Sequence, residues 1–140
     1  MASPDLLMVC VSSLSPRAAT LLRRGSRMAG RLNTDWIVAY VETPEEAPQR
    51  IDAEAQRHLL ANIDKARELG AVVARLQGRD AVRALVDYAR AHGVRQIMIG
   101  RSHRPWWQRL FGRSFVARMV KEATDFDVHI VAFDDPGEHA

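Results

Sequence analysis

A segment rich in arginine and aromatic residues, GRSHRPWWQRLFGRS, covers positions 100–114. Between Gly100 and Ser114 it holds four arginines, one histidine, two adjacent tryptophans and one phenylalanine. Guanidinium groups bind phosphate through paired hydrogen bonds, and a glycine lets the backbone approach a ligand closely. A serine that starts a helix lies beside free N–H groups, which also bind anions. The segment therefore predicts an anion-binding loop or, through its tryptophans, a surface for nucleic acid, membrane or protein.

A second polar segment, SSLSP at positions 12–16, follows the apolar run 6–11. Ser15 is expected to cap a helix that has Pro16 as its first residue. If the apolar runs before these two segments are neighbouring strands, the hydroxyl-rich and the arginine-rich segments lie side by side. Hydroxyl groups, a helix N-terminus and positive charge together favour a phosphate ligand.

Aromatic side chains in the apolar run 35–42 form a third candidate feature. Trp36, Val38 and Tyr40 share one face of the predicted strand, because side chains alternate along a strand. Tyr40 lies near the carboxyl end, where its ring could stack on a base. Packing of the same ring, half-buried beneath a helix, explains the pattern somewhat better, and both interpretations stay open.

Catalytic and cofactor motifs are absent from the sequence. It contains no GxxxxGK[ST] phosphate loop, no GxGxxG dinucleotide motif and no GxSxG nucleophile elbow. The five histidines lack metal-ligand spacing, and His129 is expected to be structural. Asp125 and Asp127 flank the start of a predicted strand and are interpreted as turn residues. We therefore predict no catalytic residue and no metal site.

Short apolar runs alternate with longer amphipathic stretches along the chain. The predicted strands are 6–11, 35–42, 71–76, 94–100 and 126–133. Four helices are predicted between them; Asp80 and Ser114 are expected to cap two of these, and Gly70 and Gly93 to end two. This alternation predicts an α/β three-layer sandwich, with a five-stranded parallel sheet and helices on both faces.

The composition is that of one ordinary globular domain. Of the 140 residues, 47% are hydrophobic and 26% charged, and the net charge is +3. We expect one domain over residues 1–140, with polar ends at about 1–4 and 134–140. The small net charge gives little electrostatic footprint for nucleic acid, and no stretch reaches the ~20 apolar residues of a membrane span. Cys10, the single cysteine, is expected to be buried, which fits an intracellular protein.

Four segments of the chain, in this order, resemble a universal stress protein domain. They are VCVSSLSP, DWIVAYVETP, GRSHRPWWQRLFGRSFVARMV and DVHIVAF. More closely, the chain is similar to the version found in KdpD-type osmosensitive potassium-channel sensor histidine kinases. The resemblance covers nearly the whole chain. It implies the adenine-nucleotide alpha-hydrolase-like fold, with strand order 3-2-1-4-5. It also implies a regulatory domain on the cytoplasmic side of the membrane, ahead of the transmembrane helices of the kinase.

Nucleotide-binding members of that family carry the motif Gx2Gx9G[ST], and an aspartate after the first strand. In this sequence Gly100 and Ser114 match the motif. His103 and Arg113 stand in place of two glycines, and Ser12 stands in place of the aspartate. These departures argue against ATP binding in the usual manner of the family, whereas the added arginines favour some anion.

Some KdpD-type domains bind cyclic di-AMP through the pattern SxS, twenty residues, then FTAxY. Ser13 and Ser15 match here, and after the same interval Tyr40 matches while Trp36 replaces the phenylalanine. The resemblance thus implies ATP or cyclic di-AMP as candidate ligands. The residues expected at the nucleotide are Ser12, Ser13, Ser15, Trp36, Tyr40, Val41, Gly100, Arg101, His103, Ser114 and Phe115.

A KdpD-type domain would have no catalysis of its own. It would regulate its parent kinase, and through it the potassium-uptake response, by binding a nucleotide or a protein. The expected partners are other domains of the parent kinase, small stress proteins or a second copy of the chain. Membrane contact would come only through the parent protein, and nucleic acid is not expected. The alternative is a stand-alone stress protein that binds ATP or AMP and dimerises through its fifth strand.

Overall fold

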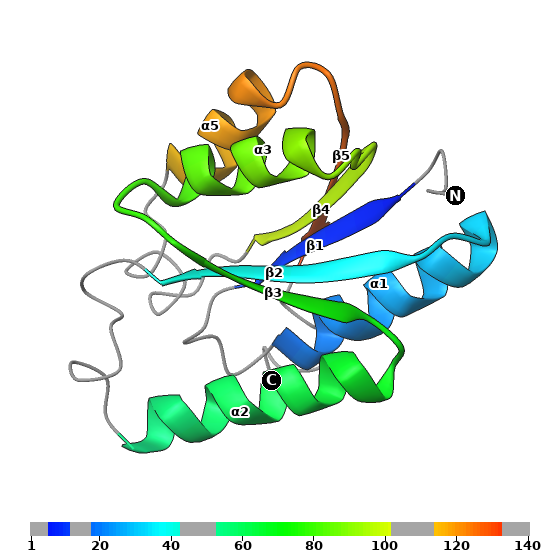
Figure 1. Cartoon of the computed structure of the whole chain (residues 1–140), viewed down its shortest axis with the longest axis vertical. Coiled ribbons are helices and arrows are strands. Elements are labelled where there is room, and N and C mark those ends of the chain that lie inside the picture. Colours follow the sequence, from blue (N-terminus) through cyan, green and yellow to red (C-terminus); the bar gives the residue numbers. More distant parts are fainter. Residues whose placement is uncertain (1–5, 12–17, 43–52, 102–113, 133–140) are drawn as a thin grey trace.

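A computed structural model describes residues 6–11, 18–42, 53–101 and 114–132 of the chain. These residues form five strands and four helices (Figure 1). In chain order they are β1 (Leu7–Val11), α1 (Ala18–Leu32), β2 (Trp36–Glu42), α2 (Ala53–Glu68), β3 (Val72–Gln77), α3 (Ala81–Ala91), β4 (Gln96–Arg101), α5 (Ser114–Glu122) and β5 (Asp127–Ala132). None of the helices in these ranges is long and apolar enough to cross a membrane.

All five strands belong to one parallel sheet with the order β3-β2-β1-β4-β5. This confirms the α/β sandwich that the sequence pattern predicted and the strand order that the family resemblance implied. β1 lies in the centre, where Leu7 pairs with Trp36 of β2 and with Gln96 of β4. The chain order reverses between β1 and β4, so their carboxyl ends form the switch point at which such sheets bind ligands.

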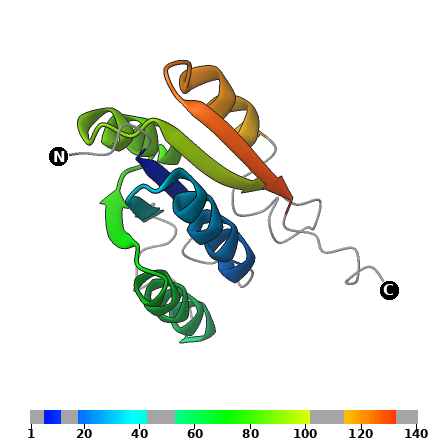
Figure 2. The same cartoon turned by 90° about the vertical axis from the view of Figure 1, so that its right-hand side faces the viewer.

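The helices form a layer on each face of the sheet (Figure 2). Leu21 and Leu22 of α1 pack with one set of strand residues, whereas Leu85 of α3 and Met119 of α5 pack with the other set. Neighbouring residues of β1, such as Met8 and Val9, point into opposite layers and are both fully buried. A strand covered on both faces needs apolar side chains at every position, which explains the continuous run LMVCV.

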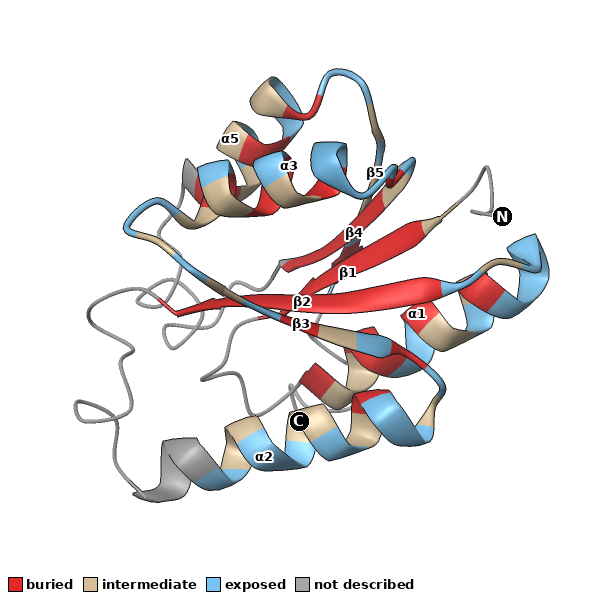
Figure 3. Cartoon of the chain, viewed as in Figure 1, coloured by how far each residue is buried: buried red, intermediate tan, exposed pale blue. Residues whose placement is uncertain are grey.

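Burial decreases from the middle of the sheet to its edges. Figure 3 shows the central strands almost entirely buried and the outer strands β3 and β5 partly exposed. Val72 of β3 is 63% exposed and Ile130 of β5 is 42% exposed. The sheet therefore presents two free edges among the described residues.

Helix ends follow the predicted signals closely. Asp80 caps α3, because its Oδ1 accepts a hydrogen bond from the backbone N–H of Arg83 at 3.3 Å. Gly70 and Gly93 follow α2 and α3 with φ angles of +93° and +71°, a conformation that favours glycine. α5 starts at Ser114 itself, whereas the sequence placed Ser114 as the cap before it. The predicted Ser15 cap and Pro16 lie outside the described residues.

α1 approaches the sheet closely at Gly25. A Cβ atom at this position would lie 2.6 Å from Val9 Cγ2 and 3.1 Å from Trp36 Cζ3. Both distances are shorter than normal van der Waals contacts, so only glycine fits without displacement of its neighbours. The indole ring of Trp36 is thereby enclosed beneath α1, with 5% of the residue exposed.

Candidate functional site

The switch point lies where β1 and β4 end side by side. β1 ends at Val11 and β4 at Arg101, and the two strands are adjacent and parallel. Both chemically interesting segments, 12–16 and 102–113, therefore leave the sheet from neighbouring strands at the same edge. Gly100 is buried in β4, next to Val131 of β5. β1 and β4 are thus neighbours, as the expected placement requires, whereas the two segments themselves lie outside the described residues.

Several predicted site residues lie outside the described part of the chain. They are Ser12, Ser13, Ser15 and His103. Arg101 and Ser114 are described through their backbone, which ends β4 and starts α5 respectively. The N-terminus of α5 thus follows the arginine-rich segment directly, as an anion site at a helix start requires. The ligand contacts of these six residues stay predictions.

Tyr40 lies near the carboxyl end of β2 and is almost completely buried, with 3% exposed. Its side chain lines a small apolar pocket with Val11 of β1 and with Leu59 and Ile63 of α2. Burial raises the pKa of the Tyr40 phenol, and the nearby Arg75 partly opposes this shift. The structure therefore favours the packing interpretation of Tyr40. Val41, the next residue, packs in the opposite layer of the core.

Trp36 lies at the other end of the same strand. It pairs with Leu7, the first residue of β1, and is about 13 Å from Tyr40 along the strand. Besides packing beneath Gly25, it lines an open recess with Asn33 and Leu69, at the end of the sheet where the strands begin. The structure does not bring Trp36 and Tyr40 together at the switch point. A ligand role for Trp36 stays a prediction that this placement does not support.

Phe115 belongs to the first turn of α5 and is 7% exposed. Its ring packs in the core cluster that also contains Met119 and Ile99. The side chain thus anchors the start of α5 to the sheet. A ligand above the helix start would meet the backbone of this turn, while the ring stays in the core.

An ion pair between a buried glutamate and a half-exposed arginine, near the ends of β2 and β3, was not predicted from the sequence. Glu42, the last residue of β2, is 7% exposed, and its carboxylate accepts a hydrogen bond from the guanidinium of Arg75 in β3. The same hydrogen bond raises the pKa of Arg75. Because the pair neutralises the buried carboxylate, it leaves no net negative charge here to repel an anionic ligand. The only sequence signal was a single acid at the end of an apolar strand.

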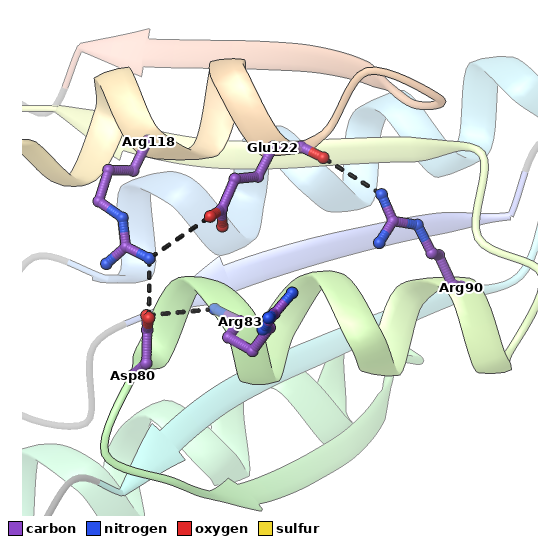
Figure 4. A network of polar contacts seen from close by, with 5 residues as sticks. All are labelled: Asp80, Arg83, Arg90, Arg118 and Glu122. Atoms are coloured by element: carbon purple, nitrogen blue, oxygen red, sulfur yellow. Dashed lines mark hydrogen bonds and ion pairs between the residues drawn. The ribbon is translucent and has the colours of Figure 1, made fainter.

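A network of ion pairs holds α5 against α3 (Figure 4). Arg118 of α5 donates to Asp80 at 2.7 Å and lies 3.6 Å from Glu122. Arg90 of α3 donates to the backbone oxygen of Glu122 at 3.2 Å and to both carboxylate oxygens of Asp125 at 3.1 Å. These hydrogen bonds lower the pKa of Asp80 and of Asp125. The helix that follows the arginine-rich segment is thereby held against α3 at its middle, through Arg118, and at its C-terminal end.

Other polar groups of the sheet have structural partners. His129 Nε2 lies 2.6 Å from the side-chain oxygen of Gln96, whose amide nitrogen donates to Asp127 at 3.1 Å. This agrees with the structural role expected for His129. Cys10 is buried, and burial raises its pKa to about 12, so the thiol stays protonated. No cluster of potential metal ligands occurs within the described ranges.

Comparison with known sequences places the chain among sensor and stress proteins. The model of the universal stress protein family matches residues 6–132. The sensor protein KdpD of Escherichia coli (strain K12) is 35% identical over 133 residues, which cover 94% of this chain and 14% of that protein. KdpD of Mycobacterium tuberculosis (strain H37Rv) is 34% identical over 122 residues, covering 83% and 13%. The chain thus spans a small part of the length of these relatives.

Comparison with solved structures gives the same fold. A universal stress protein in complex with cAMP has a TM-score of 0.67 and 22% identity, covering 93% of this chain and 98% of its own. The universal stress protein of Archaeoglobus fulgidus in complex with dAMP has a TM-score of 0.62 and 19% identity, covering 94% and 99%. At these identities the likeness establishes the fold alone.

Proposed function

Because this chain belongs to the universal stress protein family, we propose that it acts as a regulatory domain of a KdpD-type sensor histidine kinase. The similarity to the E. coli sensor protein KdpD, over 94% of this chain, is the observation that carries the proposal. Kinase activity and control of potassium uptake would belong to the regions of such a protein that this chain does not match. The domain itself would bind and would not catalyse, and it would lie on the cytoplasmic side of the membrane.

The ligand of the switch point would be an adenine nucleotide, with ATP and cyclic di-AMP as the candidates. Gly100 and the start of α5 supply a close backbone approach and a helix N-terminus at one edge of the sheet. The arginines of the segment 100–114 would add the positive charge that a phosphate needs. The complexes of similar stress proteins with cAMP and dAMP support the same ligand class.

Regulation would follow from a difference in ligand affinity between two states of the domain. A ligand held by the segment 100–114 acts directly on the start of α5. The ion pairs of Arg118 and Arg90 would pass any shift of α5 on to α3. Other domains of the kinase, or a small stress protein, would then sense the altered outer surface of these two helices.

A stand-alone stress protein that binds ATP or AMP is the second candidate function. The free edge of β5, where Ile130 is 42% exposed, favours it, because an edge strand can pair with a second copy. Sedimentation analysis tests this candidate, which requires a dimer that depends on residues of β5.

Calorimetric titration with ATP, AMP and cyclic di-AMP tests the ligand proposal. We expect at least one nucleotide to bind and Arg101→Ala to weaken binding about tenfold, since a charged hydrogen bond to phosphate is lost. Arg95→Ala is the matched control, because Arg95 is an exposed arginine just before the opposite end of β4. Absence of binding by all three nucleotides at millimolar concentration, or equal weakening by both variants, would contradict the proposal.

A phosphorylation assay on a complete KdpD-type protein carrying this domain tests regulation. The bound nucleotide should change the rate of autophosphorylation or of dephosphorylation, and Arg101→Ala should reduce the change. A nucleotide that binds the domain but leaves both rates unaltered would contradict regulation without contradicting binding.

A further inference from the structure

Three arginines form a stripe along the exposed side of α1. Arg24, Arg27 and Arg31 are exposed, and together they line one open surface recess. Their spacing of i, i+3 and i+7 brings them to one side of the helix over about 10 Å. We call these residues the α1 arginine stripe.

The stripe differs from the other arginines that hold described elements together. Arg75, Arg90 and Arg118 each lie within ion-pair distance of a carboxylate. In contrast, no acidic residue occurs in α1, whose sequence is AATLLRRGSRMAGRL. Among the described residues, no carboxylate forms an ion pair with any member of the stripe.

The stripe opposes the stability of the helix that carries it. Like charges at i,i+3 and i,i+4 repel each other on a helix surface, and these are the spacings of Arg24 to Arg27 and of Arg27 to Arg31. Arg31 is compensated, because it lies in the last turn beside the negative end of the helix dipole. Arg24 and Arg27 gain no such benefit. Their positive charge is therefore better explained by a negative group outside the described fold.

The stripe is separate from the switch point. α1 connects two parallel strands and must run back across the sheet, so its second half lies toward the amino edge, where Trp36 starts β2 (Figure 1). The candidate nucleotide segments leave the sheet at the opposite edge. Nucleotide binding and the stripe can thus be tested independently.

The chemistry of the surface distinguishes between possible anionic partners. A helix that lies in a membrane surface inserts apolar side chains beside its basic ones. In α1 the side chains of Leu21 and Leu22 are fully buried in the core, and only Leu32, at 37%, is exposed among the large apolar residues. α1 also has no aromatic residue on which a nucleic acid base could stack.

We propose that the α1 arginine stripe binds an acidic segment of a protein partner. The partner segment is a helix that presents carboxylates three to four residues apart, in register with the arginines. The planar guanidinium fork matches a carboxylate through two parallel hydrogen bonds, and a helix is the element that repeats carboxylates at the required spacing. The contact is electrostatic and exposed, so it weakens as salt rises.

Fluorescence anisotropy with a labelled synthetic helical peptide tests the proposal. The probe carries glutamates at i, i+4 and i+7, and a twin peptide carries glutamines instead. The variant Arg24→Gln/Arg27→Gln/Arg31→Gln should bind the glutamate peptide about tenfold more weakly than the wild type at low salt. The glutamine peptide should not bind. Thermal unfolding of the variant should show an intact fold, since the replaced side chains make no described ion pair.

The control variant is Arg57→Gln/Arg83→Gln/Arg95→Gln, which removes the same charge from exposed arginines outside α1. It should bind the glutamate peptide within about twofold of the wild type. Equal weakening by the control would show that binding depends on the net charge of the protein and not on the stripe, and it would overturn the proposal. Failure of the wild type to bind the glutamate peptide would overturn it too. So would stripe-dependent binding of phosphatidylserine vesicles or duplex DNA in place of the peptide.

Discussion

Replacement of Gly25 by alanine should destabilise the protein, although alanine is the better helix former. The added Cβ would lie 2.6 Å from a methyl group of Val9. Val9 is fully buried in the central strand, and its β-branched side chain has few alternative rotamers, so it cannot move away easily. Trp36, at 3.1 Å, is enclosed as well. Overpacking of this kind costs about 1–3 kcal/mol, against a helix-propensity gain of about 1 kcal/mol. We expect a net loss of about 1 kcal/mol.

Gly30→Ala provides the matched control on the same helix. A Cβ at Gly30 would meet no atom within 4 Å, so the substitution should stabilise the protein by about 0.5–1 kcal/mol through helix propensity alone. Urea unfolding of both variants should give unchanged slopes and midpoints that move in opposite directions, with a total separation of about 1 M for a typical slope of ~2 kcal/mol/M. If Gly25→Ala were as stabilising as Gly30→Ala, the close approach of α1 to the sheet would be refuted.

The other predictions concern the polar groups of the fold. Asp80→Ala should cost about 1–2 kcal/mol through loss of the α3 cap, measured by urea unfolding at pH 7. The pKa of Asp80 is lowered in the folded state, so its carboxylate stabilises the protein fully above the unfolded pKa of about 3.9. This stabilisation is lost as the pH falls through the lower folded value. The difference in unfolding free energy between Asp80→Ala and the wild type should therefore shrink toward pH 3. Cys10, with a pKa of about 12, should resist iodoacetamide at pH 8 in the native protein and react only in urea; labelling at the rate of a free thiol would contradict its burial. Arg75→Ala should destabilise the protein by about 1–2 kcal/mol, and more than Glu42→Gln does. The first variant leaves the buried Glu42 carboxylate unpaired, whereas the second replaces that carboxylate with a neutral amide. The loss stays moderate because Arg75 is half exposed. The opposite order of these two variants in urea unfolding would show that Glu42 reaches solvent.

The strand pattern and the helix ends could be predicted because their signals are local. The run at β1 requires burial on both faces, and Asp80, Gly70 and Gly93 act on their own helices. Strand order came from the resemblance to a family, since periodicity does not show which strands pair. The fold was therefore predicted correctly, with strand ends shifted by one or two residues and with Ser114 inside α5 instead of before it.

The candidate site could be predicted only in part. Trp36 and Tyr40 were correctly placed on one face of a strand, but their shared face does not show that they lie at opposite ends of the sheet or that α1 and α2 cover them. The pairing of Glu42 with Arg75 depends on the register between two strands joined by a long helix, which no local pattern encodes. Whether an aromatic residue lies in the core or at the candidate binding site depends on its position in the folded sheet, which its residue type does not show.

Asp80 connects the opening motions of two helices that are distant in sequence. One carboxylate oxygen holds the first turn of α3 and the other holds Arg118, 38 positions further along the chain. A fluctuation that releases this carboxylate frees the start of α3 and the middle of α5 at the same time. The backbone amides of α3 that follow its first turn and those of α5 around Arg118 should therefore exchange their hydrogens with solvent as one cooperative unit. A ligand bound at the start of α5 would then slow exchange in α3 as well, without any contact to it.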